Sequence, residues 1–370
     1  MGQARGLDEV RLAPHLHRMN RRRALFGSLV GLSVAALGAV GIRSQRNPYY
    51  EGPESGHFDG LRFHLGPNTR DKSQRDLLAW RFGGEAAQWP ASFPSPHRDT
   101  PPPRVDGDAL RVSYVGHASV LIQTHGVNLL IDPVWAERAS PVTFAGPKRV
   151  NDPGILLDDL PSLDAVLVTH NHYDHLDVAT LSSLARGKAK RFITPLGNDS
   201  IMSDYDAAIR AEAHDWGARI EVGRGVFVNF VPCYHWSARG VLDRRMALWT
   251  AFVIETPSGN IYHVGDTGFG DGAFFKQMND TYGRFRLAIL PIGAYAPRWF
   301  MRDQHVDPEE SLQIMQIVGA DRAMAHHWGT FQLTEEPIEE PPQKLRAALD
   351  RAGVTHDRFA VIRPGQALEG

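Results

Sequence analysis

The segment 168–177, VTHNHYDHLD, constrains the fold of this 370-residue chain more than any other feature. It continues the apolar run AVLV, which is typical of a buried strand. His170 and His172 are two residues apart and can point the same way from extended backbone, and the turn that follows returns Asp174 and His175 to the same place. Imidazole and carboxylate groups at this spacing are ligands for zinc and related divalent ions. The segment therefore predicts a metal site at the end of a strand.

Three later segments repeat this pattern of an apolar run that ends at a potential ligand. His235 follows VFVNFVPCY, Asp266 lies in the turn GDTG after IYHV, and His327 follows RAMAH. Adjacency leaves two alternatives open, because His326 competes with His327 and His263 competes with Asp266. Each candidate ends a strand at a sharp turn, where its side chain can reach a shared site. Together with the first segment, they supply enough ligands for a pair of metal ions.

These segments resemble the metallo-β-lactamase-fold hydrolases. THNHYDHLD, GDTGF, PIGAYAPRWFM, QHVDPEE and HWGTF further resemble the N-acylphosphatidylethanolamine-hydrolysing phospholipase D family and its bacterial relatives, over about residues 47–365. The resemblance implies an α/β fold, a four-layer αβ/βα sandwich, with two zinc ions per chain, although His and Asp ligands also accept other divalent metals. The ligands that it implies form two groups and one bridging residue: His170, His172 and His235; Asp174, His175 and His327; and Asp266.

The resemblance also implies an activity. This is hydrolysis of the phosphodiester of N-acylphosphatidylethanolamine-type phospholipids to N-acylethanolamine and phosphatidate, by attack of a metal-bridging hydroxide. The expected catalytic residues are Asp174, Asp266 and His305, and the leaving alkoxide could take its proton from Asp174, His305 or water. His305 matches a family position near the substrate headgroup, so we expect His305 and Gln304 to bind substrate, but the same segment is also typical of a cap before a helix at Pro308.

Other functions remain open at this point. The same fold could hydrolyse a lactone, a sugar-phosphate lactone or another phosphodiester, since it hosts many hydrolases. A non-catalytic metal-binding protein is the alternative outside enzymes. A bridging aspartate argues against that alternative, because structural zinc sites tend to hold a single four-coordinate ion.

Residues 24–42, ALFGSLVGLSVAALGAVGI, form a stretch without charge. A helix of this length spans roughly 28 Å, close to the hydrocarbon core of a bilayer. Four arginines precede the stretch closely and two follow it, so the positive-inside rule predicts a cytoplasmic N-terminus and a catalytic domain on the far, periplasmic or extracytoplasmic side. Cleavage near Ala39-Val40-Gly41 would instead export the protein. We favour a retained membrane anchor.

Composition divides the chain into three parts. Residues 1–46 are a basic N-terminus with eight arginines and two acidic residues, residues 47–105 an extended proline-rich wrap, and residues 106–370 the catalytic domain. Six prolines within residues 90–103 exclude a helix interior or a central strand there. In the catalytic domain we expect strands in runs and then strands that alternate with helices, a pattern typical of a layered α/β fold.

Charge and cysteine content narrow the expected partners. The net charge of −2 combines a basic N-terminus with an acidic body, which argues against a nucleic-acid partner. Cys233 is the only cysteine, so an intrachain disulfide is excluded. The segment 295–302 is aromatic, apolar and basic, and would suit a membrane interface if it is exposed. We expect a phospholipid substrate and a membrane as partners, leave a homodimer open, and assign no function to other histidines such as His117.

Overall fold

The computed structural model describes residues 46–66 and 72–370. The predicted membrane segment, residues 24–42, lies outside the described residues, as does almost all of the basic N-terminus. Among the helices that are described, none has the length and apolar character needed to cross a bilayer. Contacts group Asn47–Gly370 into a single unit.

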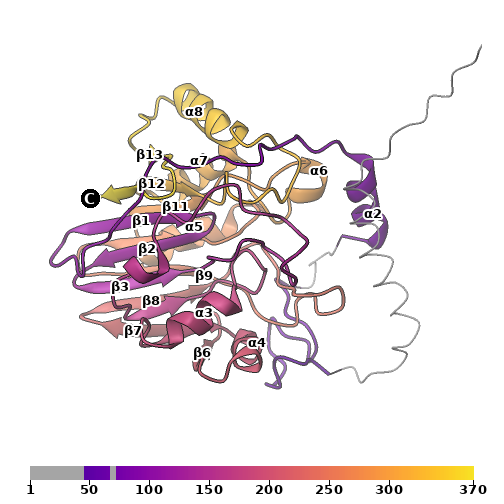
Figure 1. Ribbon diagram of the computed structural model, residues 1–370, viewed down its shortest axis with the longest axis horizontal. Helices are drawn as coiled ribbons and strands as arrows, with labels where there is room; N and C mark the ends of the chain where they lie inside the picture. Colours follow the sequence, from indigo (N-terminus) through magenta and orange to yellow (C-terminus); the bar gives the residue numbers. More distant parts are fainter. Residues whose placement is uncertain (1–45, 67–71) are drawn as a thin grey trace, which may run out of the picture. The chain divides into compact units, whose positions relative to one another are not determined.

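Two seven-stranded sheets form the centre of the unit (Figure 1). The first sheet contains β1 (Leu110–Gly116), β2 (Ser119–Thr124), β3 (Val127–Ile131), β4 (Ala165–Leu167), β5 (Phe192–Pro195), β6 (Ala211–His214) and β14 (Ala367–Glu369). The second contains β7 (Arg219–Gly223), β8 (Val226–Val231), β9 (Ala251–Glu255), β10 (Asn260–His263), β11 (Phe285–Pro291), β12 (Ala320–His326) and β13 (Phe359–Ala360). Their orders are β14-β1-β2-β3-β4-β5-β6 and β13-β12-β11-β10-β9-β8-β7.

Both sheets are mixed, and strand direction decides where the loops gather. In the first sheet β3, β4, β5 and β6 run parallel, and β1 shares their direction because β2 is antiparallel to both β1 and β3. In the second sheet β10, β11 and β12 run parallel, and β8 shares their direction through the antiparallel strand β9. The carboxyl ends of β1 and β4 therefore lie at one edge of their sheet, and those of β8, β10 and β12 at one edge of theirs.

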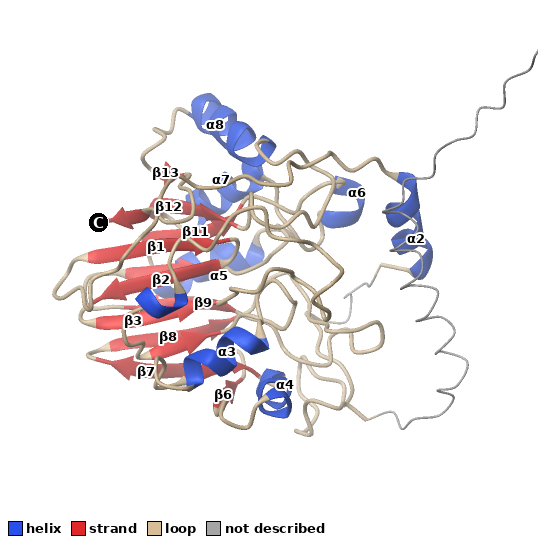
Figure 2. Ribbon diagram, viewed as in Figure 1, coloured by secondary structure: helices blue, strands red, loops and turns tan. Residues whose placement is uncertain are grey.

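Helices cover the outer faces of the two sheets (Figure 2). The described helices are α2 (Gln74–Gly83), α3 (Val178–Ala185), α4 (Asn198–Tyr205), α5 (Ala273–Tyr282), α6 (Arg298–Met301), α7 (Pro308–Ile317) and α8 (Glu340–Ala352), with a 3₁₀ turn η2 (Leu157–Asp159). Residues of α3 and α4 pack on the first sheet, and residues of α5, α7 and α8 pack on the second.

Alternation along the strands explains this layering. In β2, Ile122 faces the second sheet, whereas its neighbour Leu121 packs among residues of α3 and α4. In β9, Phe252 faces the first sheet and Val253 faces α5, α7 and α8. Successive side chains of a strand point to opposite faces, so an apolar strand supplies both a central and an outer core. The arrangement agrees with the predicted αβ/βα sandwich.

Local signals account for several boundaries. The turn between β2 and β3 places His125 at φ 50° and Gly126 at φ 70°, the left-handed pair typical of a two-residue hairpin. Asp177 caps α3 by accepting hydrogen bonds from two backbone amides, and Asp307 caps α7 together with Glu310, with Pro308 in the first turn. Of these elements, the sequence predicted the start of α7 at Pro308.

The proline-rich segment differs from the expectation of an extended wrap. It contains α2, which begins where Ser73 and Asp76 form a reciprocal capping box. Its aromatic side chains do pack on the catalytic domain, because Phe58 and Phe63 are buried in the core beneath the second sheet. The helix α8 was also not anticipated.

Candidate metal centre

The candidate ligands converge because strand ends converge. Five strands end one to four residues before a candidate ligand: β1 before His117, β4 before His170, β8 before His235, β10 before Asp266 and β12 before His327. Ligand atoms from residues that follow strands of both sheets approach one another at this end of the sandwich. The loops at this end of the sandwich therefore form one site.

The first group consists of His170, His172, His235 and Asp266. Nδ1 of His172 lies 2.8 Å from Nε2 of His170 and 3.2 Å from Nε2 of His235. Oδ2 of Asp266 lies 3.9 Å from Nε2 of His170 and 3.6 Å from Nε2 of His235. Three imidazole nitrogens and a carboxylate oxygen thus face a common centre, all within 4.8 Å of one another.

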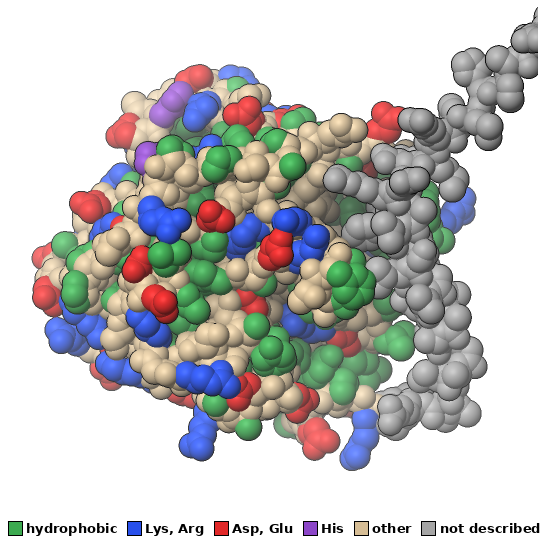
Figure 3. All heavy atoms as spheres, in the orientation of Figure 1, with side chains coloured by type: hydrophobic (Ala, Val, Ile, Leu, Met, Phe, Trp, Pro, Cys, Tyr) green, Lys and Arg blue, Asp and Glu red, His purple; other side chains and the backbone are tan. Residues whose placement is uncertain are grey.

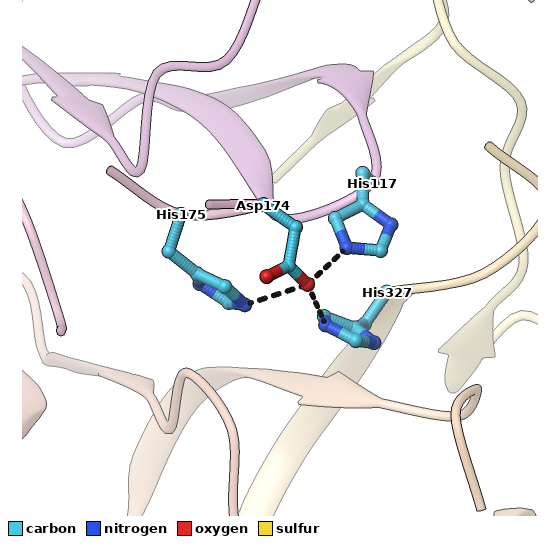
Figure 4. Close-up of side chains that lie close together, drawn as sticks. All are labelled: His117, Asp174, His175 and His327. Atoms are coloured by element: carbon cyan, nitrogen blue, oxygen red, sulfur yellow. Dashed lines mark hydrogen bonds and ion pairs between the residues drawn. The ribbon is translucent and has the colours of Figure 1, made fainter. Parts of the chain in front are cut away.

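The second group consists of His117, Asp174, His175 and His327 (Figure 4). Oδ2 of Asp174 lies 2.9 Å from Nε2 of His117 and 3.2 Å from Nε2 of His327. The same oxygen lies 3.6 Å from Nε2 of His175. In Figure 4 the three rings point at this carboxylate from separate segments of the chain. The structure brings together the three expected ligands of the second group and adds His117, which the sequence did not single out.

Asp266 joins the two groups. Besides its contacts in the first group, its Oδ2 lies 3.2 Å from Nε2 of His175 and its Oδ1 lies 3.2 Å from Nε2 of His327. The competing residues are placed elsewhere: the rings of His263 and His326 pair with each other at 5.2 Å and belong to none of the ligand groups among the described residues. The geometry therefore selects Asp266 over His263, and His327 over His326.

The charge states suit a cation. Burial lowers the pKa of His172 and of His235 to about 3, so both rings are neutral at pH 7. Burial would raise the pKa of Asp266, but His327 and His175 hold it well below its usual range, so this carboxylate is ionised. Burial would lower the pKa of His327, but Asp266 and Asp174 raise it to about 9. In the metal-free protein a proton thus lies where a cation would bind.

Hydrogen bonds on the far side of two rings set their tautomers. Nδ1 of His235 donates to the carbonyl oxygen of Gln304 at 3.0 Å, and Nδ1 of His175 donates to Oδ2 of Asp132 at 2.7 Å. A ring that donates from Nδ1 presents the lone pair of Nε2 to the site. Imidazole nitrogens and carboxylate oxygens of both groups face a common centre, where a cation can replace the proton that they now share, so the residues present fit a metal centre.

Asp132 is a second residue of the site, besides His117, that the sequence did not single out. It directly follows β3 and is fully buried. Besides His175, it accepts hydrogen bonds from the backbone amide and the hydroxyl of Thr169, each at 2.7 Å. Its position after an apolar strand is the same signal that identified His235, Asp266 and His327, so the rule could have found it.

His305 and Gln304 lie beside the metal centre and are both buried. Nδ1 of His305 is 3.9 Å from Oδ2 of Asp266, and its ring lies between those of His235, at 5.2 Å, and His327, at 5.6 Å. Gln304 contacts His235 through its backbone carbonyl. Asp307 also caps α7, so the segment serves both the site and the helix start. Substrate binding by Gln304 and His305 stays a prediction.

Comparisons with known proteins agree with this site. The family described as beta-lactamase superfamily domain matches residues 127–328. An N-acyl-phosphatidylethanolamine-hydrolyzing phospholipase D of Caenorhabditis elegans is 36% identical over 270 residues, which cover 70% of this chain and 76% of that protein. An uncharacterised protein of Mycobacterium tuberculosis is 34% identical over 356 residues, which cover 94% of this chain and 91% of that protein.

A solved structure gives the same fold. The isothiocyanate hydrolase from Delia radicum gut bacteria superposes with a TM-score of 0.54 at 16% identity, over 70% of this chain and 98% of that one. At this identity the likeness concerns the fold alone. The family match and the sequence identity to the nematode protein indicate common descent. This chain therefore belongs to the metallo-β-lactamase superfamily of metal-dependent hydrolases, in the family that includes the N-acyl-phosphatidylethanolamine-hydrolyzing phospholipases D.

Proposed function

We propose that this protein hydrolyses the phosphodiester of N-acylphosphatidylethanolamine-type phospholipids and releases N-acylethanolamine and phosphatidate. The observation that carries the proposal is the position of Asp266, whose carboxylate contacts both ligand groups. Two adjacent metal sites suit displacement at phosphorus, because both the attacking and the leaving oxygen need stabilisation. The substrate class rests on the similarity to the nematode phospholipase.

The proposed cofactor is a pair of zinc ions that share one residue. When bound, such a pair supplies Lewis acidity at the phosphoryl oxygens and lowers the pKa of water toward neutrality. The proposed ligands of the two ions, with the shared residue last, are His170, His172 and His235; Asp174, His175 and His327; and Asp266. The tautomers of His175 and His235 leave Nε2 free for this role.

The charge states of Asp174 and His305 decide what each side chain can do in catalysis. Burial would raise the pKa of Asp174, but His175, His117 and His327 hold it well below its usual range. Asp174 is therefore ionised at pH 7 and has no proton to give to the leaving alkoxide. Burial lowers the pKa of His305 to about 3, so its neutral ring offers a hydrogen bond to the headgroup. We infer that solvent water supplies the proton that the leaving alkoxide takes up.

Exposed apolar side chains on segments that adjoin site residues in the chain support a lipid substrate. Trp299 on α6 is 52% exposed, and Val241 and Leu242 in the loop after His235 are 75% and 59% exposed. Hydrophobic side chains gather toward the lower right of the face in Figure 3. Exposed apolar residues beside a catalytic centre suit contact with lipid chains or headgroups.

The segment 295–302 only partly fits the interface that we expected. Tyr295, Phe300 and Met301 are buried, and the guanidinium of Arg298 binds the Glu310 carboxylate and the carbonyl of His305. Trp299 alone among these aromatic residues faces solvent. The segment therefore combines a buried wall beside the site with one exposed anchor.

The test is turnover by the zinc-loaded full chain in ¹⁸O-water. N-acylphosphatidylethanolamine in mixed micelles is offered beside a lactone and a generic phosphodiester, and products are followed by mass spectrometry. We expect N-acylethanolamine, with one ¹⁸O in the phosphate of the phosphatidate, and no release by His172→Ala. Hydrolysis of the lactone alone would refute the substrate, and label in the ethanolamine product would refute attack at phosphorus.

We propose further that residues 24–42 anchor the protein in a membrane, with the catalytic domain on the extracytoplasmic side. A variant that lacks residues 1–46 is expected in the soluble fraction and active on detergent-dispersed substrate. Recovery of the full chain in the soluble fraction, with its N-terminus intact, would contradict the anchor.

A further inference from the structure

His117 occupies an unusual place at the end of β1. The pairing register of β1 and β2 shifts between Tyr114 and Gly116, and Gly116 and His117 then adopt φ values of 136° and 56°. A left-handed conformation is unfavourable for a residue with a side chain and persists only where its surroundings enforce it. A bulge at a strand end turns the following side chain in a new direction. Here it turns His117 into the metal centre.

The backbone of His117 holds the loop that carries His327. Its amide donates to Oγ1 of Thr330 at 3.2 Å, and its carbonyl oxygen accepts from the amide of His327 at 2.7 Å. His327 is itself left-handed, at φ 61°. Two strained residues from different sheets thus support each other through a direct hydrogen bond.

The side chain of His117 is directed at a single carboxylate. The residue is 1% exposed, its ring lies edge-on to Phe331 at 5.1 Å, and Nε2 lies 2.9 Å from Oδ2 of Asp174. An ionised carboxylate only accepts hydrogen bonds, so Nε2 of His117 is the donor. Its Nδ1 has no hydrogen-bond partner among the described residues. The ring's polar contact is therefore the one to Asp174.

His117 differs in this respect from the other histidines of its group. His175 and His327 each approach Asp266 at 3.2 Å as well as Asp174. Among the described carboxylates, His117 forms an ion-pair contact only with Asp174. A nitrogen that donates a proton to a carboxylate offers no lone pair to a cation. The contact thus favours a supporting role over a place among the ligands.

We propose that His117 is a positioning residue for the second metal. Its Nε2–H fixes the carboxylate of Asp174 and its carbonyl fixes the backbone of His327, so that both ligands face the same ion. The proposal rests on the metal-binding part of the proposed function and not on the substrate. Removal of the hydrogen-bond partner of a metal ligand typically lowers metal affinity by about 10–100-fold.

The test measures zinc binding by chelator competition, without substrate, in the full chain. His117→Ala removes the donor, whereas His117→Gln keeps an N–H donor at a similar reach. The matched control is His125→Ala, because His125 is also left-handed, at φ 50°, but binds Ser258 Oγ at the opposite end of β2. The melting temperature of the metal-free form reports folding.

We expect His117→Ala to weaken the second zinc by about 10–100-fold and to leave the first unchanged. His117→Gln is expected within about threefold of the wild type, and His125→Ala is expected to match it. Wild-type affinity in His117→Ala would overturn the proposal, as would equal losses in the Ala and Gln variants, which would indicate a ligand. If His117→Ala does not fold, His117→Phe, which keeps a buried ring but has no donor, is judged by the same criterion as the Ala variant. Normal zinc binding without lipid turnover would refute the substrate only.

Discussion

Oδ2 of Asp132 lies 2.7 Å from Nδ1 of His175, and both residues are fully buried. Asp132 follows β3 of the first sheet, whereas the opposite nitrogen of His175 faces Asp266, which follows β10 of the second. The carboxylate thus selects which nitrogen of His175 faces the metal centre. Such an arrangement fixes both the orientation and the tautomer of a metal-binding imidazole.

The near-isosteric change Asp132→Asn tests this relationship. If the amide nitrogen faces Nδ1 of His175, the ring must move its proton to Nε2 and lose the lone pair that binds metal. We expect zinc at this position to bind about 10–100-fold more weakly, measured by chelator competition. The control is Asp164→Asn, at the opposite end of β4, where Asp164 binds Arg104 and Lys190. Equal zinc affinity in the two variants would contradict the assignment.

Adjacent histidines provide a second test. His327→Ala removes a ring that contacts Asp174 and Asp266, whereas His326→Leu removes a ring that belongs to none of the ligand groups among the described residues. We expect the His327 variant to hold one zinc per chain and the His326 variant to hold two, by elemental analysis after dialysis. The reverse pattern would exchange the two roles and refute our assignment.

The exposed indole of Trp299 predicts a difference between substrates. Trp299→Ala removes apolar area that would contact lipid, so we expect turnover on vesicles to fall roughly fivefold, which corresponds to about 1 kcal/mol. Turnover of a short-chain, water-soluble diester is expected to stay unchanged. Tyr205→Ala is the control, because Tyr205 is similarly exposed, at 56%, and ends α4. Equal losses on both substrates would place Trp299 in the catalytic site instead.

Buried His263 predicts a pH-dependent stability in the metal-free protein. Burial lowers its pKa to about 4 from the ordinary value of 6.5. Between these values the unfolded state binds a proton that the folded state does not, so the free energy of unfolding falls as the pH falls from 6.5 to 4. One such group contributes about 1.4 kcal/mol per pH unit. We expect His263→Phe to reduce this slope in urea unfolding at pH 5–6, and an unchanged slope would contradict the burial effect.

The sequence predicted much of the site because one rule applied repeatedly. His170, His235, Asp266 and His327 all follow apolar strands, and parallel strands carry such residues to one edge of a sheet. His117 also follows an apolar strand, Leu110–Gly116, but it has no ligand-like neighbour in the sequence, so the pattern does not distinguish it from an ordinary histidine. Its role depends on a bulge and on contacts with a strand about 200 positions away, which local sequence does not reveal.

The fold shows the same limits. Continuous apolar strands such as β2 and β8 carry a clear signal in the sequence, because buried strands of a sandwich are apolar on both faces. The edge strands β6 and β7 are mostly half-exposed and lack that signal. Pro341 and Pro342 obscured α8, although both lie in its first turn, where proline is tolerated. These elements form only through tertiary contacts.

The central claim is that two cations bind at this end of the sandwich and share Asp266. Anomalous scattering at the zinc absorption edge, from crystals of the zinc-loaded protein, tests it most directly. We expect two peaks per chain, one surrounded by His170, His172 and His235 and the other by Asp174, His175 and His327, each in contact with Asp266. A single peak away from Asp266, or none in fully loaded crystals, would contradict it.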